Sequence, residues 1–345
     1  MTTKRMVFIG DLHLEGPLRE YIDGLDGLIM REVQGIVTAA SKKGYNIVVL
    51  LGDLFHKYAV KARSYTLLSP LFTANPDTQF LIIGGNHDVD SQSTEREHSL
   101  DLLAQQVKDG IYPNVKVALH DPIDLWSKTP VRMLPWPLNE TRKDALNIIH
   151  LDAAGAKQDN GRDSSAEWTT DHFCISGHLH TPQRVKDIWY PGTLYQTSFG
   201  ETQSKSIIYV DWTGDRSTSR VKRVPYAPPF LLHNEVVATD QDYAALKERL
   251  LQAAPTDLFK VFVHAEVMLP RDAFSPYPNV VKTNPFKTKA ELKAALVNEL
   301  LIETRSIQEL DIPDVFESWA ASQDVDPSLR KRAQARLTTY LQALT

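Results

Sequence analysis

The sequence is poor in cysteine and in long hydrophobic runs. Cys174 is its only cysteine, so no intrachain disulfide can form and a disulfide-stabilised scaffold is excluded. No apolar run approaches the roughly 20 residues that a membrane-spanning helix needs. Residues 1–13 also hold too few consecutive apolar positions for the core of a signal peptide. We therefore expect a cytoplasmic protein with no membrane segment.

The bulk charge and composition are unremarkable for a globular protein. A net charge of −5 over 345 residues argues against a chain that coats nucleic acid by bulk charge, although it leaves room for a local basic groove. The hydrophobic share of 42% and the charged share of 23% are ordinary, and the length suits two domains. There are no internal repeats and no low-complexity tracts.

One pattern recurs up to about residue 200: an apolar, β-branched run stops abruptly at a polar cluster. Such runs are typical of strands that are buried on both faces. Residues 27–43 and 62–74, between the runs, carry apolar positions three and four apart and predict helices. Alternating strands and helices predict an α/β domain, in which groups that follow the strands meet at one edge of the sheet. The runs are residues 6–9, 47–51, 80–83, 148–149 and 173–175.

Prolines mark the predicted domain boundaries. Pro225, Pro228 and Pro229 punctuate the chain before a β-α-β pattern with strands at 231–237 and 259–269. A second proline-containing stretch, 270–285, reads as a linker to a helical tail. We therefore predict three parts: a domain over 1–225, a small α/β domain over 226–285 and a helical tail over 286–345.

The polar clusters concentrate metal-binding side chains. Imidazole and carboxylate together suit borderline first-row metals such as Mn, Fe or Zn, and the absence of cysteine argues against a structural zinc site. Seven candidate ligands are too many for one tetrahedral ion and about right for two ions that share a carboxylate. Two ions roughly 3.5–4 Å apart can clamp a phosphoryl group and generate a hydroxide nucleophile. The candidates are Asp11, His13, Asp53, Asn86, His150, His178 and His180.

Each cluster on its own has a plainer interpretation. Asp11 could simply cap a turn, and Asn86-His87-Asp88 after two glycines could be only a turn. A lone loop histidine such as His150 is more often a surface residue than a ligand. Gly177-His178-x-His180 is stronger, because residues two apart on an extended segment can reach neighbouring ions. The occurrence of all five clusters at strand ends favours a single site.

In this order the motifs Asp-x-His, Gly-Asp, Gly-Asn-His-Asp, a lone His and Gly-His-x-His resemble those of the calcineurin-like metallophosphoesterases. The resemblance covers about residues 5–210 and implies a four-layer αββα domain. It implies that His87 does not bind metal but faces the scissile phosphate, where it protonates the leaving oxygen or stabilises developing charge. Asp88 would orient His87. The implied ligands are Asp11, His13 and His180 for the first metal, Asn86, His150 and His178 for the second, and Asp53 as the bridge.

Two further stretches resemble SbcD-type DNA-repair nucleases, a meiotic-recombination-eleven-like family with phage-encoded relatives. They are Gly52-Asp53-Leu54-Phe55-His56 and the run from His178 through residues 190–201. The resemblance implies that His56 contacts the substrate phosphate. It also implies that the small α/β domain caps DNA, that the tail binds a coiled-coil ATPase and that helices near 62–74 and 95–108 pair two subunits. Leu67, Leu68, Leu71 and Phe72 could supply that pairing surface or pack in the core.

We therefore expect a Mn-dependent DNA nuclease subunit of an SbcCD-like complex, acting in DNA repair, recombination or replication. It would be an exonuclease on duplex ends and an endonuclease on single strands, with two Mn²⁺ ions or, alternatively, Mg²⁺. Its expected partners are DNA, an SbcC-like ATPase and a second copy of the chain, in a bacterial or phage-infected host cell. The alternatives are a stand-alone small-molecule phosphodiesterase or phosphatase, and a non-catalytic metal-binding scaffold, against which the His87-Asp88 pair argues.

Overall fold

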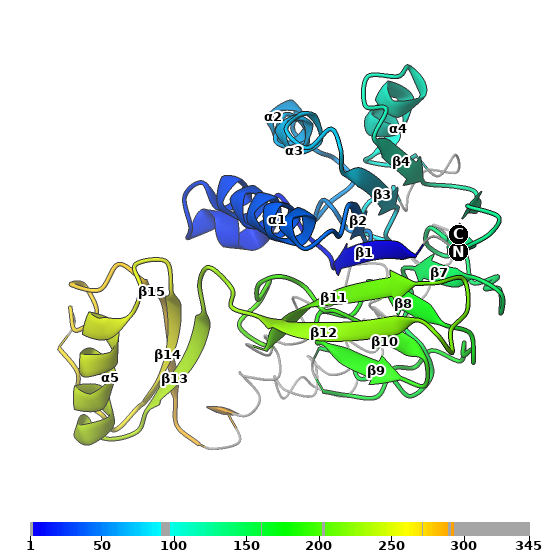
Figure 1. The fold of residues 1–345 in the computed structure, drawn as a ribbon. Helices are drawn as coiled ribbons and strands as arrows, with labels where there is room; N and C mark the ends of the chain where they lie inside the picture. The colour runs from blue at the N-terminus through cyan, green and yellow to red at the C-terminus, as the bar shows by residue number, and fades with distance from the viewer. Residues whose placement is uncertain are drawn as a thin grey trace, which may run out of the picture. The chain divides into compact units, whose positions relative to one another are not determined.

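Three β-sheets organise the part of the chain that the structure describes (Figure 1). The structure is a computed structural model, and it describes residues 3–90, 97–159, 161–201, 204–270, 272–288 and 291–292. The α/β fold class is confirmed. The predicted helical tail lies outside the described residues except for its first few positions. No described helix has both the length and the apolar character to span a membrane.

The first sheet has six strands in the order β12-β11-β1-β2-β3-β4. Strands β1 to β4 run parallel to one another. Strand β11 pairs antiparallel with β1, and the edge strand β12 pairs antiparallel with β11. The helices that follow its strands pack on its outer face and share one apolar core with it. The strands are β1 (Lys4–Ile9), β2 (Ile47–Leu50), β3 (Gln79–Ile83), β4 (Val115–Ala118), β11 (Lys205–Trp212) and β12 (Arg220–Tyr226); the helices are η1 (Pro17–Glu20), α1 (Leu25–Lys42), α2 (Ala62–Tyr65), α3 (Leu68–Thr73) and α4 (Asp101–Lys108).

The second sheet also has six strands, in the order β5-β6-β7-β8-β10-β9. Strands β6, β7, β8 and β10 run parallel, while β5 and β9 lie antiparallel at the edges. The strands are β5 (Ile123–Leu125), β6 (Val131–Met133), β7 (Leu146–Ile149), β8 (Cys174–Ser176), β9 (Gln183–Val185) and β10 (Ile188–Tyr190).

The two six-stranded sheets pack face to face. Met6 and Phe8 of β1 lie in the core between the sheets, and Val7 and Ile9 of the same strand lie in the core under the helices. All four side chains are fully buried, which explains why the strand is a continuous apolar run rather than an alternating one. Burial of each such side chain stabilises the fold by about 1.5–3 kcal/mol.

The outer face of the second sheet is covered by a loop where the four-layer expectation placed helices. Cys174 and Tyr190 of the sheet pack there against Ala153, Ala156 and Trp168. Between Ile149 and Cys174 the described residues, all but residue 160, form no helix. The predicted loop over 153–171 is thus confirmed. The loop takes the place of the fourth layer, because its few apolar side chains are enough to cover the outer face of the second sheet.

The third sheet follows β12 and holds three parallel strands in the order β13-β14-β15. Strand β13 (Leu232–Val237), helix α5 (Asp240–Gln252) and strand β14 (Leu258–His264) confirm the predicted β-α-β unit. The Thr239 side chain caps α5 in a capping box. Strand β15 (Val280–Phe286) was predicted as a linker, and that prediction is wrong. Its polar, half-exposed sequence and Pro285 suit an edge strand but hide it from a hydrophobicity pattern.

The predicted helix over 62–74 is two short helices, α2 and α3. Leu68, Leu71 and Phe72 are buried in the core that α1 and β3 share, and Leu67 is partly buried against it. Three of the four residues considered for a subunit-pairing surface are therefore core residues. The apolar spacing of these residues reflects packing within the chain rather than a contact between subunits.

Candidate metal centre

All seven predicted ligands lie together at the carboxyl ends of β1, β2, β3, β7 and β8. Asp11, Asp53 and His150 are each no more than 1% exposed. The strands arrive parallel within their two sheets, and each ends just before its polar cluster. A parallel arrangement puts these ends on one side, so groups more than 160 residues apart in sequence come into contact.

The backbone at the strand ends is unusual. His13, Asp53 and His178 have φ values of 43°, 46° and 79°, in the left-handed region that few residues other than glycine adopt. Such strain persists only where surrounding contacts enforce it. Here the amides of Leu12 and His13 both donate to the Asp53 carbonyl, at 3.1 and 2.9 Å. These hydrogen bonds hold the turn after β1 against the turn after β2, so that the side chains of His13 and Asp53 lie close together.

The first predicted ligand group converges on one point. The Nε2 atoms of His13 and His180 are 3.0 Å apart, and Asp11 Oδ2 lies 3.9 Å from His180 Nε2. The ligand atoms of these three side chains all lie within 4.8 Å of one another. The predicted set of Asp11, His13 and His180 is therefore brought together.

The second predicted group is as compact. Asn86 Oδ1 lies 3.0 Å from His150 Nε2 and 2.9 Å from His178 Nδ1. Asp53 stands between the groups: its Oδ2 is 3.2 Å from His150 Nε2 and 3.9 Å from His13 Nε2. This is the position that a bridging carboxylate requires.

When the histidine rings are neutral, as metal ligands must be, they carry too few hydrogen atoms for the contacts they make. His150 Nδ1 donates to the Leu51 carbonyl at 2.6 Å, so Nε2 of the neutral ring carries only a lone pair. That lone pair nevertheless faces the oxygens of Asn86 and Asp53. The facing Nε2 atoms of His13 and His180 pose the same problem. A cation in each group resolves both, so the residues fit two divalent metal ions.

The pKa values show how strongly the metal-free site attracts positive charge. Burial lowers the pKa of His150, but the carboxylates of Asp53 and Asp11 outweigh it and raise the pKa to about 9. Burial also lowers the pKa of His180, whereas Asp159 and Glu201 raise it to about 10. Burial raises the pKa of Asp11 to about 6. In the metal-free site, protons on these side chains thus occupy the positions of metal ions, and metal binding has to displace these protons.

Behind His180 lies a buried network that the sequence did not reveal. Glu201 accepts a hydrogen bond from His180 Nδ1 at 2.8 Å and pairs with Lys205 Nζ at 2.7 Å. Asp159 accepts from the His180 amide at 2.9 Å. By holding Nδ1–H, Glu201 fixes the ring tautomer that presents the Nε2 lone pair to a metal. Glu201 ends the stretch that resembles SbcD-type nucleases, but no role was predicted for it. Its four-residue spacing from Lys205 is one that many exposed pairs share.

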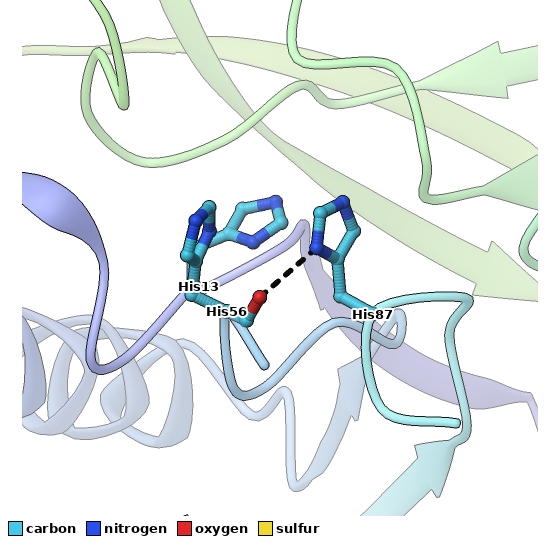
Figure 2. A group of neighbouring side chains, drawn as sticks. All are labelled: His13, His56 and His87. Atoms are coloured by element: carbon cyan, nitrogen blue, oxygen red, sulfur yellow. Dashed lines mark hydrogen bonds between the residues drawn. The ribbon is translucent and has the colours of Figure 1, made fainter. Parts of the chain in front are cut away.

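Two histidines that were not predicted as ligands lie beside the centre (Figure 2). The His87 ring stacks on His56, with centroids 5.3 Å apart, and lies edge-on to His13 at 4.9 Å. His87 Nδ1 donates to the His56 carbonyl at 3.0 Å. Nε2 is therefore the nitrogen of His87 that remains to exchange a proton with a substrate.

Asp88 has a different role from the one expected. It is fully buried and accepts hydrogen bonds from the amides of Gly85 and Phe55 and from the Ser99 hydroxyl, at 3.0, 3.2 and 3.1 Å. The ring of His87 is instead oriented by the His56 carbonyl. Asp88 fixes the loop backbone that carries Asn86 and His87, and so acts on His87 only indirectly.

Gly85 shows how tightly this loop is fitted. A Cβ atom at this position would lie 2.1 Å from Asp53 Oδ1. That oxygen accepts the His87 amide at 2.8 Å, so the bridging carboxylate and the Gly-Asn-His-Asp turn are built as one unit.

Comparison with known proteins identifies the family. Residues 4–182, slightly more than half of the chain, match the calcineurin-like phosphoesterases. The chain belongs to this family. Because its buried histidine and carboxylate groups could hold metal ions, this phosphoesterase is a metal-dependent hydrolase of phosphoesters.

Two similar proteins extend the comparison. "Putative phosphoesterase 244L" of Invertebrate iridescent virus 6 is 25% identical over 234 residues, which cover 60% of this phosphoesterase and 76% of the viral protein. "DNA double-strand break repair protein Mre11" of Aeropyrum pernix is 23% identical over 304 residues, which cover 75% and 72% of the two chains. The match to Mre11 covers 75% of this chain, which is more residues than the 225 of the predicted first domain. It therefore takes in part of the third-sheet segment.

Proposed function

We propose that this phosphoesterase is the Mn-dependent DNA nuclease subunit of an SbcCD-like complex that acts in DNA repair, recombination or replication. It would cleave phosphodiester bonds as an exonuclease on duplex ends and as an endonuclease on single strands. The observation that carries the proposal is the stacked pair of His56 and His87, whose rings both lie edge-on to the predicted ligand His13. One histidine would contact the phosphate while the other serves the leaving oxygen.

The similarity to Mre11 supports this choice of substrate. The match extends beyond the phosphoesterase region into the segment of the third sheet. A phosphatase for small molecules has no evident need for that additional sheet. In our proposal the sheet borders the DNA, and the segment after residue 290 binds a coiled-coil ATPase. A second copy of the chain would complete the complex in the cytoplasm of a bacterial or phage-infected host cell.

The chain's own residues have distinct tasks in this reaction. Asp11, His13, His180, Asn86, His150 and His178 would hold the ions, with Asp53 between them. The ions, when bound, supply a nucleophile from water and stabilise charge on the phosphoryl oxygens. His56 contacts a non-bridging oxygen of the scissile phosphate. With hydrogen on both ring nitrogens, His87 gives the Nε2 proton to the departing oxygen of the sugar and becomes neutral, while Nδ1–H stays bonded to the His56 carbonyl and keeps the ring in place.

A substrate comparison tests the proposal. With Mn²⁺ present, we expect cleavage of linear duplex and single-stranded DNA that stops when EDTA removes the metal. Mononucleotides and small phosphomonoesters should be hydrolysed much less efficiently, measured as kcat/KM. Efficient hydrolysis of small phosphoesters with no cleavage of DNA would refute the nuclease proposal and favour the small-molecule phosphodiesterase or phosphatase.

A shortened chain serves as the control for the partner. Without the residues after position 290, the phosphoesterase should keep its Mn-dependent DNA cleavage. It should no longer co-purify with a co-expressed SbcC-like coiled-coil ATPase. Retention of the ATPase by the shortened chain would show that the partner binds elsewhere.

A further inference from the structure

A cavity of about 400 Å³ opens beside His56, on the flank of the metal centre. Its wall comes from three segments: the loop after β1 with η1, the turn after β2, and the start of α2. Four cationic and two acidic side chains line it, in a chain whose net charge is −5. The cavity is therefore a local positive site on an acidic protein. Its lining residues of interest are His56, Lys57, Lys61, Arg63, Arg19 and Glu15.

One of the two acidic side chains in this wall, Glu15, is already neutralised. Glu15 accepts hydrogen bonds from the Lys61 amide, at 3.0 Å, and from the Ser64 hydroxyl, and its other oxygen pairs with Arg19 at 3.4 Å. The Glu15 carboxylate thereby ties the loop after β1 to the start of α2. It builds the cavity wall, and Glu20 is the lining carboxylate that these contacts leave charged against the four cations.

Three cations of the wall remain available. Lys57, Lys61 and Arg63 are exposed, and within the described residues none of their side chains forms an ion pair or a hydrogen bond. Cationic side chains that outnumber the carboxylates of a concave site favour an anionic ligand. Phosphate oxygens are suited to such a site because Arg and Lys bind them by charge-assisted hydrogen bonds.

His56 connects this cavity to the metal centre. Its ring lines the cavity and also stacks on His87, with centroids 5.3 Å apart. A phosphodiester chain whose scissile phosphate lies beside His87 would thus have a neighbouring phosphate near Lys57 and Lys61. A mononucleotide, which has no second diester, could not use both sites.

We propose that this cavity, the Lys57 pocket, binds a non-scissile phosphate of a nucleic-acid strand and makes the enzyme prefer polynucleotides to small phosphoesters. The proposal rests on the nuclease function proposed above. Arg63 and Arg19 also line a second cavity of about 500 Å³, which offers the strand a continuation away from the metal centre.

The test compares two variants of the full chain with equal changes in charge. One is Lys57→Gln, Lys61→Gln, Arg63→Gln. The control is Lys108→Gln, Lys116→Gln, Lys128→Gln, which alters three exposed cations outside the pocket. Single-stranded DNA binding is measured without metal by fluorescence anisotropy at several salt concentrations. Cleavage of the same DNA and of bis(p-nitrophenyl) phosphate is measured with Mn²⁺.

In the pocket variant, the slope of log binding constant against log salt should fall by at least about 0.7, the contribution of one phosphate on a single strand. The KM for single-stranded DNA should rise about tenfold, and hydrolysis of bis(p-nitrophenyl) phosphate should be unchanged. A slope and a KM equal to those of the control variant would overturn the pocket while leaving the nuclease proposal intact. Conversely, the pocket variant could weaken DNA binding while the natural chain cleaves no DNA. That result would overturn the nuclease function alone.

Discussion

Replacement of His87 by Gln is expected to lower the kcat for DNA cleavage by about 10²- to 10⁴-fold, the usual contribution of general acid–base catalysis. Glutamine can still donate a hydrogen bond to the His56 carbonyl, which His87 Nδ1 now contacts at 3.0 Å. It cannot transfer a proton. The metal content should stay the same, because none of the close contacts within the two ligand groups involves His87.

The choice of substrate separates a proton donor from a structural residue. p-Nitrophenolate departs without needing a proton, so the same variant should lose much less activity on bis(p-nitrophenyl) phosphate than on DNA. His120→Gln, at an exposed histidine outside the site, is the matched control. Equal losses on both substrates would show that His87 acts in binding or folding. Full activity on DNA would refute its catalytic role.

Asp53→Asn is expected to have the second large effect, and this effect should be independent of the substrate. Asp53 Oδ2 lies between the two ligand groups, and Oδ1 accepts the His87 amide at 2.8 Å. An amide in this place keeps the shape but removes the negative charge that two cations would share. Hydrolysis should fall by more than about 100-fold, the upper range for loss of a group that only supports a metal ligand. The metal content should fall below two ions per chain.

The stability of the metal-free Asp53→Asn variant provides the control. Burial raises the pKa of Asp53, yet His150 and His87 hold it well below its usual range, so the carboxylate is charged. Burial raises the pKa of Asp11 to about 6 and that of Asp88 to about 7, and the nearby charge of Asp53 adds to both shifts. The lowered pKa of Asp53 shows that attraction to histidine outweighs this repulsion. At neutral pH the metal-free variant should therefore unfold at a lower temperature than the natural chain, and the two metal affinities are compared below that temperature. Two ions bound with unchanged affinity would contradict the bridging role.

The sequence predicted the centre because each ligand cluster directly follows a strand buried on both faces. The run at residues 47–51 corresponds to β2, and Asp53 follows it. Parallel strands bring such clusters together whatever the rest of the fold, so the site could be assembled before the layers were known. The left-handed backbone of His13 and Asp53 could not be foreseen, since tertiary contacts impose it.

Other features stayed hidden for physical reasons. Strands β5, β6 and β9 have only three residues each, too few for a pattern of alternation. The Glu201–Lys205 pair looks like a surface pair in sequence, because only the fold buries it against His180. The expected role of Asp88 rested on its position next to His87. The structure shows its carboxylate turned to the backbone amides of Gly85 and Phe55 instead.

The most direct test of the two-metal account is a crystal structure of the chain grown with Mn²⁺, with anomalous diffraction recorded at the manganese edge. The account predicts two manganese peaks roughly 3.5–4 Å apart, one among Asp11, His13 and His180 and the other among Asn86, His150 and His178, with Asp53 touching both. A single peak, or two peaks that Asp53 does not bridge, would contradict it.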